Sequence, residues 1–143
     1  MNGPGAGSAP VPVEELGRVH LIGVGGAGVS VVARLLAACG LDVQGSDAVR
    51  SAAPEALEAD GERAWVGQDA DRVVDATGVP GADTAAVCSA LRTDNPELSA
   101  ARAAGVRVLH RSEALASFMA GRRGVAVAGA HGKTTTSAMI ATV

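Results

Sequence analysis

The sequence predicts an α/β protein with a Rossmann-like, doubly wound parallel sheet. Short apolar runs alternate with helical patterns along most of the 143 residues, which is typical of parallel strands joined by crossover helices. The first apolar run, residues 19–22, passes through a glycine turn straight into a helical pattern. A strand that feeds a helix in this way opens such a sheet.

Each element follows from a local pattern. Gly40 is placed to end the first helix, Asn95 to cap a later helix with Pro96 behind it, and Ser112 to cap the next. Residues 68–83 are expected to be mostly loop, with a short strand or a helical turn at 72–76. Strands are expected at residues 19–24, 41–44, 62–66, 84–89 and 106–109, and helices at 27–39, 51–60, 96–104 and 113–119.

The composition excludes several classes of function. The net charge of −3 provides no basic surface for nucleic acid, and Trp65 and Phe118 are the only aromatic residues. Cys39 and Cys88 follow no metal or redox spacing, so they are expected to be free thiols in the reducing cytoplasm. No apolar stretch reaches the roughly 20 residues that a membrane span needs.

The first glycine turn has the pattern G-x-G-x-x-G at Gly23, Gly25 and Gly28, with an additional Gly26. Glycines let the backbone approach an anion, Gly28 lets the helix pack on its strand, and the helix start presents unpaired N–H groups. We therefore predict a phosphate or pyrophosphate site. The alternative is a glycine-rich turn that binds nothing.

Two further segments are expected beside this turn. Ser46 and Asp47 lie about 20 residues beyond it, where such folds keep an acid that contacts ribose. The alternative for Asp47 is an Asx turn or a helix cap. Residues 89–93 follow a buried strand, and a parallel sheet would bring their start, Ser89, near the glycine turn.

A second glycine turn follows an expected strand at residues 124–128 and precedes a helix that is expected to begin at 137. It contains Lys133, the single lysine among twelve basic residues, followed by Thr134. Backbone amides and Lys133 would hold phosphates, and the Thr134 hydroxyl would bind Mg²⁺. The spacing G-x-x-G-K-T is shorter than the common phosphate loop, and a threonine-rich helix start without a ligand is the alternative.

These motifs together resemble those of the Mur ligases of peptidoglycan synthesis. The resemblance extends over residues 17–143 and is weakest at 68–83. The matching segments are residues 19–30, 45–47, 94–97, 108–113 and 128–136.

The resemblance implies a three-domain enzyme, in which the first domain binds the UDP part of a nucleotide sugar, the second binds ATP and the third receives an amino acid. ATP would convert the muramyl carboxylate of the substrate into an acyl phosphate, which an amine then attacks. The first glycine turn favours the member that joins L-alanine to UDP-N-acetylmuramate. A member that recycles muramyl tripeptide shares His-Gly-Lys-Thr-Thr. A nicotinamide-dependent oxidoreductase would fit the first turn but not the second.

The resemblance also implies roles for individual residues. Lys133 would be the catalytic cation on the ATP phosphates, and Thr134 would bind Mg²⁺. The residues implied to bind the UDP sugar are Gly25, Gly26, Ala27, Gly28, Ser30, Ser46, Asp47 and Ser89. Those implied to bind ATP are Gly129, Ala130, His131, Gly132, Lys133, Thr134 and Thr135.

Three residues depart from the family pattern. Ala130 replaces a threonine, Gln68 stands in place of a histidine, and Cys88 stands in place of a serine. The expected organisation is a disordered leader at 1–16, a UDP-sugar domain at 17–121 and the start of an ATP-binding domain at 122–143. The chain is therefore expected to be a fragment without ligase activity of its own. Its strand at 124–128 would lack neighbours and be mobile or packed non-natively.

Overall fold

The computed structural model describes residues 9–49, 63–74, 78, 80–87 and 91–142. Its centre is a five-stranded sheet in the order β3-β2-β1-β4-β5, and every pairing in it is parallel. The chain order reverses between β1 and β4, as in a doubly wound sheet, so the predicted fold class is confirmed. The strands are β1 (Val19–Ile22), β2 (Val43–Asp47), β3 (Arg63–Val66), β4 (Thr84–Val87) and β5 (Arg107–His110).

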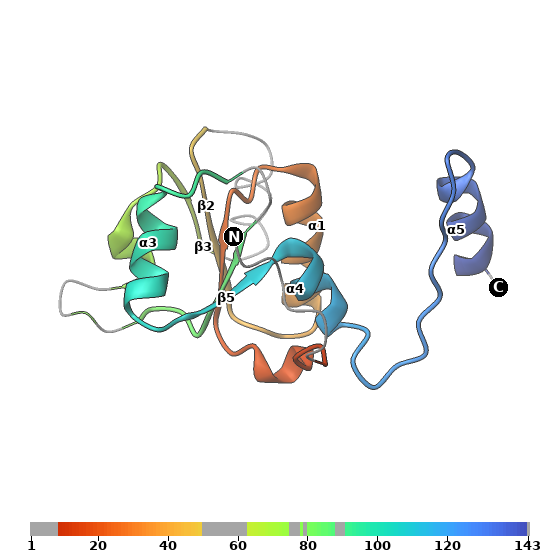
Figure 1. Ribbon diagram of the computed structural model, residues 1–143, viewed down its shortest axis with the longest axis horizontal. Helices are drawn as coiled ribbons and strands as arrows, with labels where there is room; N and C mark the ends of the chain where they lie inside the picture. Colours follow the sequence, from red (N-terminus) through yellow and green to blue (C-terminus); the bar gives the residue numbers. More distant parts are fainter. Residues whose placement is uncertain (1–8, 50–62, 75–77, 79, 88–90, 143) are drawn as a thin grey trace.

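Helices cover both faces of the sheet (Figure 1). On one face lie α1 (Ala27–Ala38) and α4 (Arg111–Ser117), which contact each other. On the other face α3 (Pro96–Ala103) packs against the short 3-10 helix η2 (Ala70–Arg72). The remaining helices are η1 (Val13–Glu15), which precedes β1, and α5 (Lys133–Ala141), which stands apart from the sheet.

The two helices that flank β1 and β4 begin and end where their sequences predict. Gly40 follows α1 with a φ of 80°, a left-handed conformation that suits glycine. The Asn95 side chain accepts hydrogen bonds from the amides of Glu97 (2.9 Å) and Leu98 (3.1 Å), so it caps α3 as expected. α1 buries the apolar face that its spacing predicts, formed by Val29, Val32, Ala33 and Leu36.

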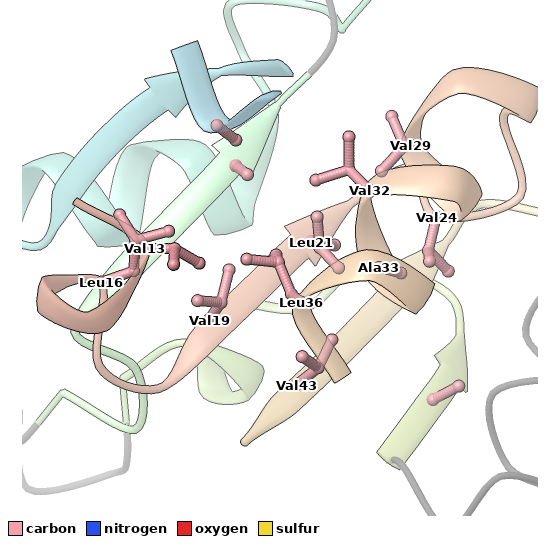
Figure 2. Close-up of a cluster of buried hydrophobic side chains, with 13 residues drawn as sticks. Val13, Leu16, Val19, Leu21, Val24, Val29, Val32, Ala33, Leu36 and Val43 are labelled. Carbon is pink, nitrogen blue, oxygen red and sulfur yellow. The ribbon is translucent and has the colours of Figure 1, made fainter. Parts of the chain in front are cut away.

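The two faces of the sheet differ in chemistry. Val19, Leu21 and Val43 point toward α1 and form an aliphatic core with it (Figure 2). Because strand side chains alternate, His20 and Ser46 point to the opposite face, beneath α3. Both are completely buried, so the α3 face carries a polar layer as well as its small apolar cluster.

The expected leader ends earlier than predicted. Residues 1–8 lie outside the described part of the chain, but η1 follows soon after. The side chains of Val13 and Leu16 are 4% and 0% exposed and belong to the aliphatic core. The core therefore includes residues before position 17, whose side chains cover the beginning of β1.

Two element boundaries also differ from prediction. β2 continues through Gly45 to Asp47, because these residues pair with β1 and β3. Gly45 is buried against Val24, where a Cβ would come within 3.1 Å of the valine Cβ. α4 begins at Arg111 rather than after Ser112. Its N-cap is His110, whose amide donates to the Glu113 carboxylate (2.6 Å) while its ring accepts from the Ser112 amide.

The segment at 124–128 does not form the predicted strand. Its residues are exposed except for half-buried Val127, and no described strand lies beside it to supply hydrogen-bond partners. The helix that was expected to begin at 137 begins at Lys133, so the Gly-Lys-Thr residues form its first turn. The expected helix at 51–60 lies outside the described residues.

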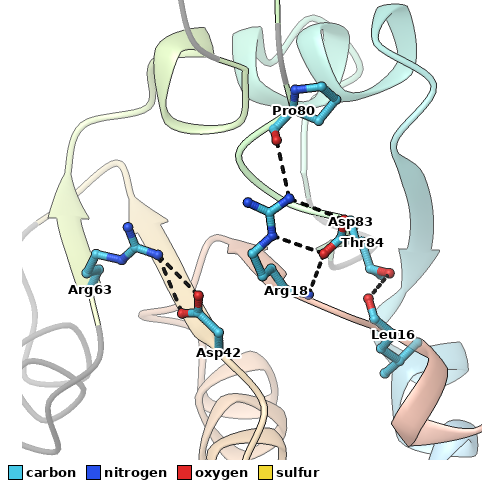
Figure 3. A network of polar contacts seen from close by, with 7 residues as sticks. All are labelled: Leu16, Arg18, Asp42, Arg63, Pro80, Asp83 and Thr84. Carbon is cyan, nitrogen blue, oxygen red and sulfur yellow. Dashed lines mark hydrogen bonds and ion pairs between the residues drawn. The ribbon is translucent and has the colours of Figure 1, made fainter.

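The turns before β1 and β4 are tied together at the edge of the sheet where the strands begin (Figure 3). The Arg18 side chain and backbone amide both donate to the Asp83 carboxylate, at 3.1 and 2.8 Å. The buried Thr84 hydroxyl donates to the Leu16 carbonyl at 2.7 Å. No helix in the described part of the chain is long and apolar enough to cross a membrane.

Candidate functional site

The β1–α1 turn is held by the end of β2. The amides of Gly23 and Val24 both donate to the carbonyl of Ser46, at 2.8 and 3.0 Å. The next amide, that of Gly25, donates to the Asp47 carboxylate at 2.7 Å. The conformation of the glycine turn is therefore fixed by residues of a neighbouring strand.

Because of these hydrogen bonds, only some amides of the glycine turn are available to bind a ligand. The Gly25 amide is occupied by Asp47, and the Gly26 amide donates to the Gly23 carbonyl at 3.1 Å. The amides of Ala27 and Gly28 have no acceptor among the described residues. They form the first turn of α1, whose N-cap Gly26 supplies no side-chain acceptor. Two such N–H groups at the positive end of a helix favour an anion.

Arg111 adds a positive charge beside these amides. A Cβ at Gly28 would collide with the Arg111 guanidinium, so this side chain lies directly over the start of α1. Gly28 was expected to allow helix–strand packing, whereas its missing side chain instead makes room for Arg111. Arg111 and Gly28 line one end of a groove of about 300 Å³ between α1 and α4.

The other residues predicted for the UDP sugar occupy different surroundings. The Ser46 hydroxyl is buried and donates to the Glu97 carboxylate, which favours a supporting role over ligand contact. Ser30 donates to the Ala27 carbonyl at 3.0 Å. Asp47 also accepts from the Val49 amide at 3.1 Å, so it forms the Asx turn that was the alternative prediction. Ser89 lies outside the described residues.

A cleft of about 330 Å³ opens where β2, β3 and β4 lead into their loops. Gln68 and Asn95 line it and are joined by a hydrogen bond from Asn95 Nδ2 to Gln68 Oε1 (2.6 Å). Arg92 and Asp94 form an exposed ion pair at its rim, and hydrogen bonding to Arg92 lowers the pKa of Asp94. Ligands of doubly wound sheets bind at this edge, beyond the carboxyl ends of the strands.

The second glycine turn lies on the exposed segment that leads into α5. The Lys133 ammonium donates to the Gly129 carbonyl at 2.5 Å, which folds the side chain back over the turn. Gly132 is the N-cap of α5 with a φ of 78° and leaves the first amides of the helix without a side-chain cap. Amides, an ammonium and threonine hydroxyls form a donor set that suits a nucleotide phosphate.

The described residues of this turn provide few ligands for a metal ion. Among the described residues no cluster of three or more histidine, cysteine or acidic side chains could hold a metal ion. The Thr134 hydroxyl is exposed at the start of α5. A magnesium ion here would therefore need phosphate oxygens for most of its ligands, as is usual when it accompanies a nucleotide.

Sequence reasoning missed two functional candidates, Arg111 and Glu97. Arg111 follows the last strand of the sheet, a position from which side chains reach the ligand edge, and this could have marked it. Glu97 was expected only as part of a family motif. In the structure it is completely buried and paired with His20 from a strand 77 residues earlier. A histidine within an apolar strand was a further sequence signal, because a buried histidine needs a polar partner.

A doubly wound parallel sheet with a glycine turn after its first strand is the architecture typical of nucleotide-binding α/β domains. The chain belongs to the Mur ligase family, because the model described as "Mur ligase family, catalytic domain" matches residues 18–123.

Curated relatives agree with this assignment. The chain is 55% identical to UDP-N-acetylmuramate–L-alanine ligase of Kineococcus radiotolerans over 99% of its own length and 29% of the relative. It is 52% identical to the enzyme of that name from Thermobifida fusca, over 94% of the chain and 27% of the relative. The chain thus spans less than a third of the length of these relatives.

Solved structures show the same fold. The UDP-N-acetylmuramate-alanine ligase of Thermotoga maritima matches with a TM-score of 0.73 and 32% identity, over 87% of this chain and 28% of that one. The UDP-N-acetylmuramate:L-alanyl-gamma-D-glutamyl-meso-diaminopimelate ligase of Neisseria meningitides matches with a TM-score of 0.72 and 27% identity, over 88% and 38% of the two chains.

Proposed function

We propose that this chain binds the UDP part of UDP-N-acetylmuramate within a cytoplasmic, ATP- and Mg²⁺-dependent ligase that adds L-alanine to the muramyl carboxylate. The observation that carries the proposal is the 55% identity to an enzyme of that name over 99% of the chain. Residues up to about 121 form the UDP-sugar-binding part, with Val13 and Leu16 included, and residues 122–143 begin the ATP-binding part.

The first site supports binding of a diphosphate. The amides of Ala27 and Gly28 donate to phosphate oxygens, and the Arg111 guanidinium balances their charge with its planar donors. The uridine then extends toward the end of β2, where Asp47 holds the turn and the cleft beside Gln68 begins. Ser89 is proposed to approach the diphosphate or sugar from the β4 loop.

The second site supports binding of ATP. When bound, ATP supplies the phosphoryl group that activates the substrate carboxylate. Lys133 would leave the Gly129 carbonyl to neutralise charge on the phosphates, and the Thr134 hydroxyl would be one ligand to Mg²⁺. The amides from Gly129 to Thr135 would be donors to the phosphates. Ala130 and His131 shape the turn, where Ala130 provides its backbone only.

A ligase that attaches a tripeptide is the second candidate, because solved structures of such enzymes match this chain at 27% and 29% identity. Eight curated relatives at 49–55% identity carry the L-alanine name, which favours L-alanine. A nicotinamide-dependent oxidoreductase is disfavoured by membership of the Mur ligase family.

The test is an NMR titration of the ¹⁵N-labelled chain with UDP-N-acetylmuramate and, separately, with NAD. We expect the amide signals of Ala27 and Gly28 to shift with the UDP sugar and to stay in place with NAD. Unchanged signals with the UDP sugar would contradict the proposal. Equal shifts with both ligands would show that the site does not distinguish the UDP sugar from NAD.

A further inference from the structure

The side chain of Glu97 connects three segments that are far apart in the sequence. It lies in the first turn of α3, it is completely buried, and its carboxylate accepts three hydrogen bonds. The donors are His20 Nε2 from β1 (3.3 Å), the Ser46 hydroxyl from β2, and the Asp69 amide after β3 (3.2 Å). A carboxylate is suited to this place because it can accept from several donors at once.

We assign the proton of the His20 ring to Nε2, because this atom lies 3.3 Å from the Glu97 carboxylate, which is an acceptor. The other ring nitrogen, Nδ1, is buried and has no hydrogen-bond partner among the described residues. With the proton on Nε2, this atom is an unpaired acceptor, which is less costly than a buried unpaired N–H donor. His20 therefore serves Glu97 as a single donor.

Through Ser46 this carboxylate reaches the glycine turn. The Ser46 hydroxyl donates to Glu97 on one side, while the Ser46 carbonyl accepts from the amides of Gly23 (2.8 Å) and Val24 (3.0 Å) on the other. The next residue, Asp47, accepts from the Gly25 amide. Moving Ser46 would therefore shift the acceptors that set the direction of the turn.

A second connection leads to the cleft. The Glu97 carboxylate accepts from the Asp69 amide, next to Gln68. The Glu97 amide donates to Asn95 Oδ1 (2.9 Å), which orients the Asn95 amide so that its Nδ2 donates to Gln68 Oε1. With its oxygen used in this way, Gln68 keeps its own –NH₂ group for a ligand in the cleft. The same residue thus orders two sides of one ligand edge.

We propose that Glu97 is the positioning residue of the UDP-sugar site, which its carboxylate holds in binding geometry through Ser46 and through the Asp69 amide beside Gln68. This inference rests on the proposed function. Glu97 touches no ligand itself. Its removal changes affinity for the UDP sugar by more than its effect on folding explains, because the amides of the glycine turn and the donors of the cleft both lose their alignment.

The experiment replaces Glu97 with glutamine, which has nearly the same shape. In either orientation the new –NH₂ group faces an N–H donor, that of His20 or that of Asp69, unless the ring changes its tautomer. The matched control is Thr84→Val, which removes another completely buried side-chain hydrogen bond, at the opposite edge of the sheet. Both variants are measured by calorimetric titration with UDP-N-acetylmuramate and by thermal unfolding.

We expect Glu97→Gln to bind about tenfold more weakly. Thr84→Val should bind within twofold of the unchanged chain, although both variants unfold at lower temperature. Equal affinity of Glu97→Gln and the unchanged chain would overturn the inference alone. Absence of UDP-sugar binding by the unchanged chain would instead overturn the proposed function, and the inference with it.

A second pair of variants covers the case in which Glu97→Gln does not fold. His20→Gln keeps an N–H donor near Glu97 and should retain affinity within about threefold, whereas His20→Leu removes the donor and should weaken binding about tenfold. Both variants lose the packing of the imidazole ring, but only His20→Leu also loses the N–H donor. A difference between their affinities therefore measures the effect of the hydrogen bond to Glu97. If His20→Leu binds as well as His20→Gln, the inference fails.

Discussion

The Asp47 carboxylate accepts a hydrogen bond from the Gly25 amide at 2.7 Å and another from the Val49 amide at 3.1 Å. This carboxylate lies where doubly wound folds hold a ribose-binding acid. In this chain it first serves to shape the glycine turn. Both of its oxygens are engaged by protein, and a ribose hydroxyl would have to share one of them.

Asp47→Ala should lower the free energy of unfolding by about 1–2 kcal/mol, because two amides lose a charged acceptor. It should also weaken binding of UDP-N-acetylmuramate, whereas Asp47→Asn, which keeps one acceptor oxygen, should lose less of both. Urea unfolding and calorimetric titration measure the two effects. Titration with 2′-deoxy-UDP then separates turn shaping from ribose contact. If the deoxy compound binds the unchanged chain as weakly as UDP binds Asp47→Ala, direct contact dominates.

Gly28→Ala should separate stability from binding. Alanine favours the helix by up to about 1 kcal/mol over glycine, so the variant should unfold at the same temperature or higher. The new methyl group displaces the Arg111 guanidinium, so affinity for the UDP sugar should fall. Thermal unfolding and titration of the same sample check both signs. A more stable variant with unchanged affinity would show that Arg111 does not contribute.

Arg111→Ala should weaken UDP-sugar binding about tenfold and reduce its dependence on salt, because a charge-assisted contact to phosphate is lost. The control is Arg34→Ala, which removes the same charge from an exposed position on α1. The double variant Gly28→Ala/Arg111→Ala should bind no more weakly than the weaker-binding single variant, because both changes remove the same contact. Additive losses in titration would contradict a shared contact.

The Arg18–Asp83 pair predicts a pH dependence of stability. Hydrogen bonding to Arg18 lowers the pKa of Asp83 below its ordinary value. The pair therefore stabilises the fold above about pH 4, and this contribution is lost as the pH falls through the lowered pKa. Arg18→Gln should move acid unfolding to higher pH, by a small amount because the pair is half exposed. Circular dichroism against pH, with exposed Arg102→Gln as control, measures the shift, and identical curves would refute it.

Lys133→Met tests the independence of the two glycine turns. Lys133 contacts the Gly129 carbonyl on an exposed segment, and α5 stands apart from the sheet in Figure 1. The variant should bind ATP at least tenfold more weakly, because the ATP phosphates lose the lysine ammonium. Its affinity for the UDP sugar should stay within twofold. Saturation-transfer NMR with each nucleotide makes the comparison. A parallel loss of UDP-sugar affinity would link the two turns.

Local patterns in the sequence were enough to predict most of the secondary-structure elements and several of their ends. The alternation of strands and helices, the Asn95 cap and the glycine after α1 all depend on residues within a few positions of one another, where backbone geometry and turn chemistry act. The family resemblance depended on the same local segments. The predicted strand at 124–128 failed because a strand also needs a neighbour, which its own pattern does not supply.

Tertiary structure alone decided which of these residues meet. The order of the strands brings Asp47 to Gly25, Arg111 to Gly28, and Glu97 to a histidine 77 residues away. A polar side chain that is buried needs a hydrogen-bond partner, because leaving it unpaired away from water costs free energy. Spacing in the sequence had placed Asp47 beside the glycine turn. It did not predict the pairings of Arg111 and Glu97, because these depend on how the whole sheet is assembled.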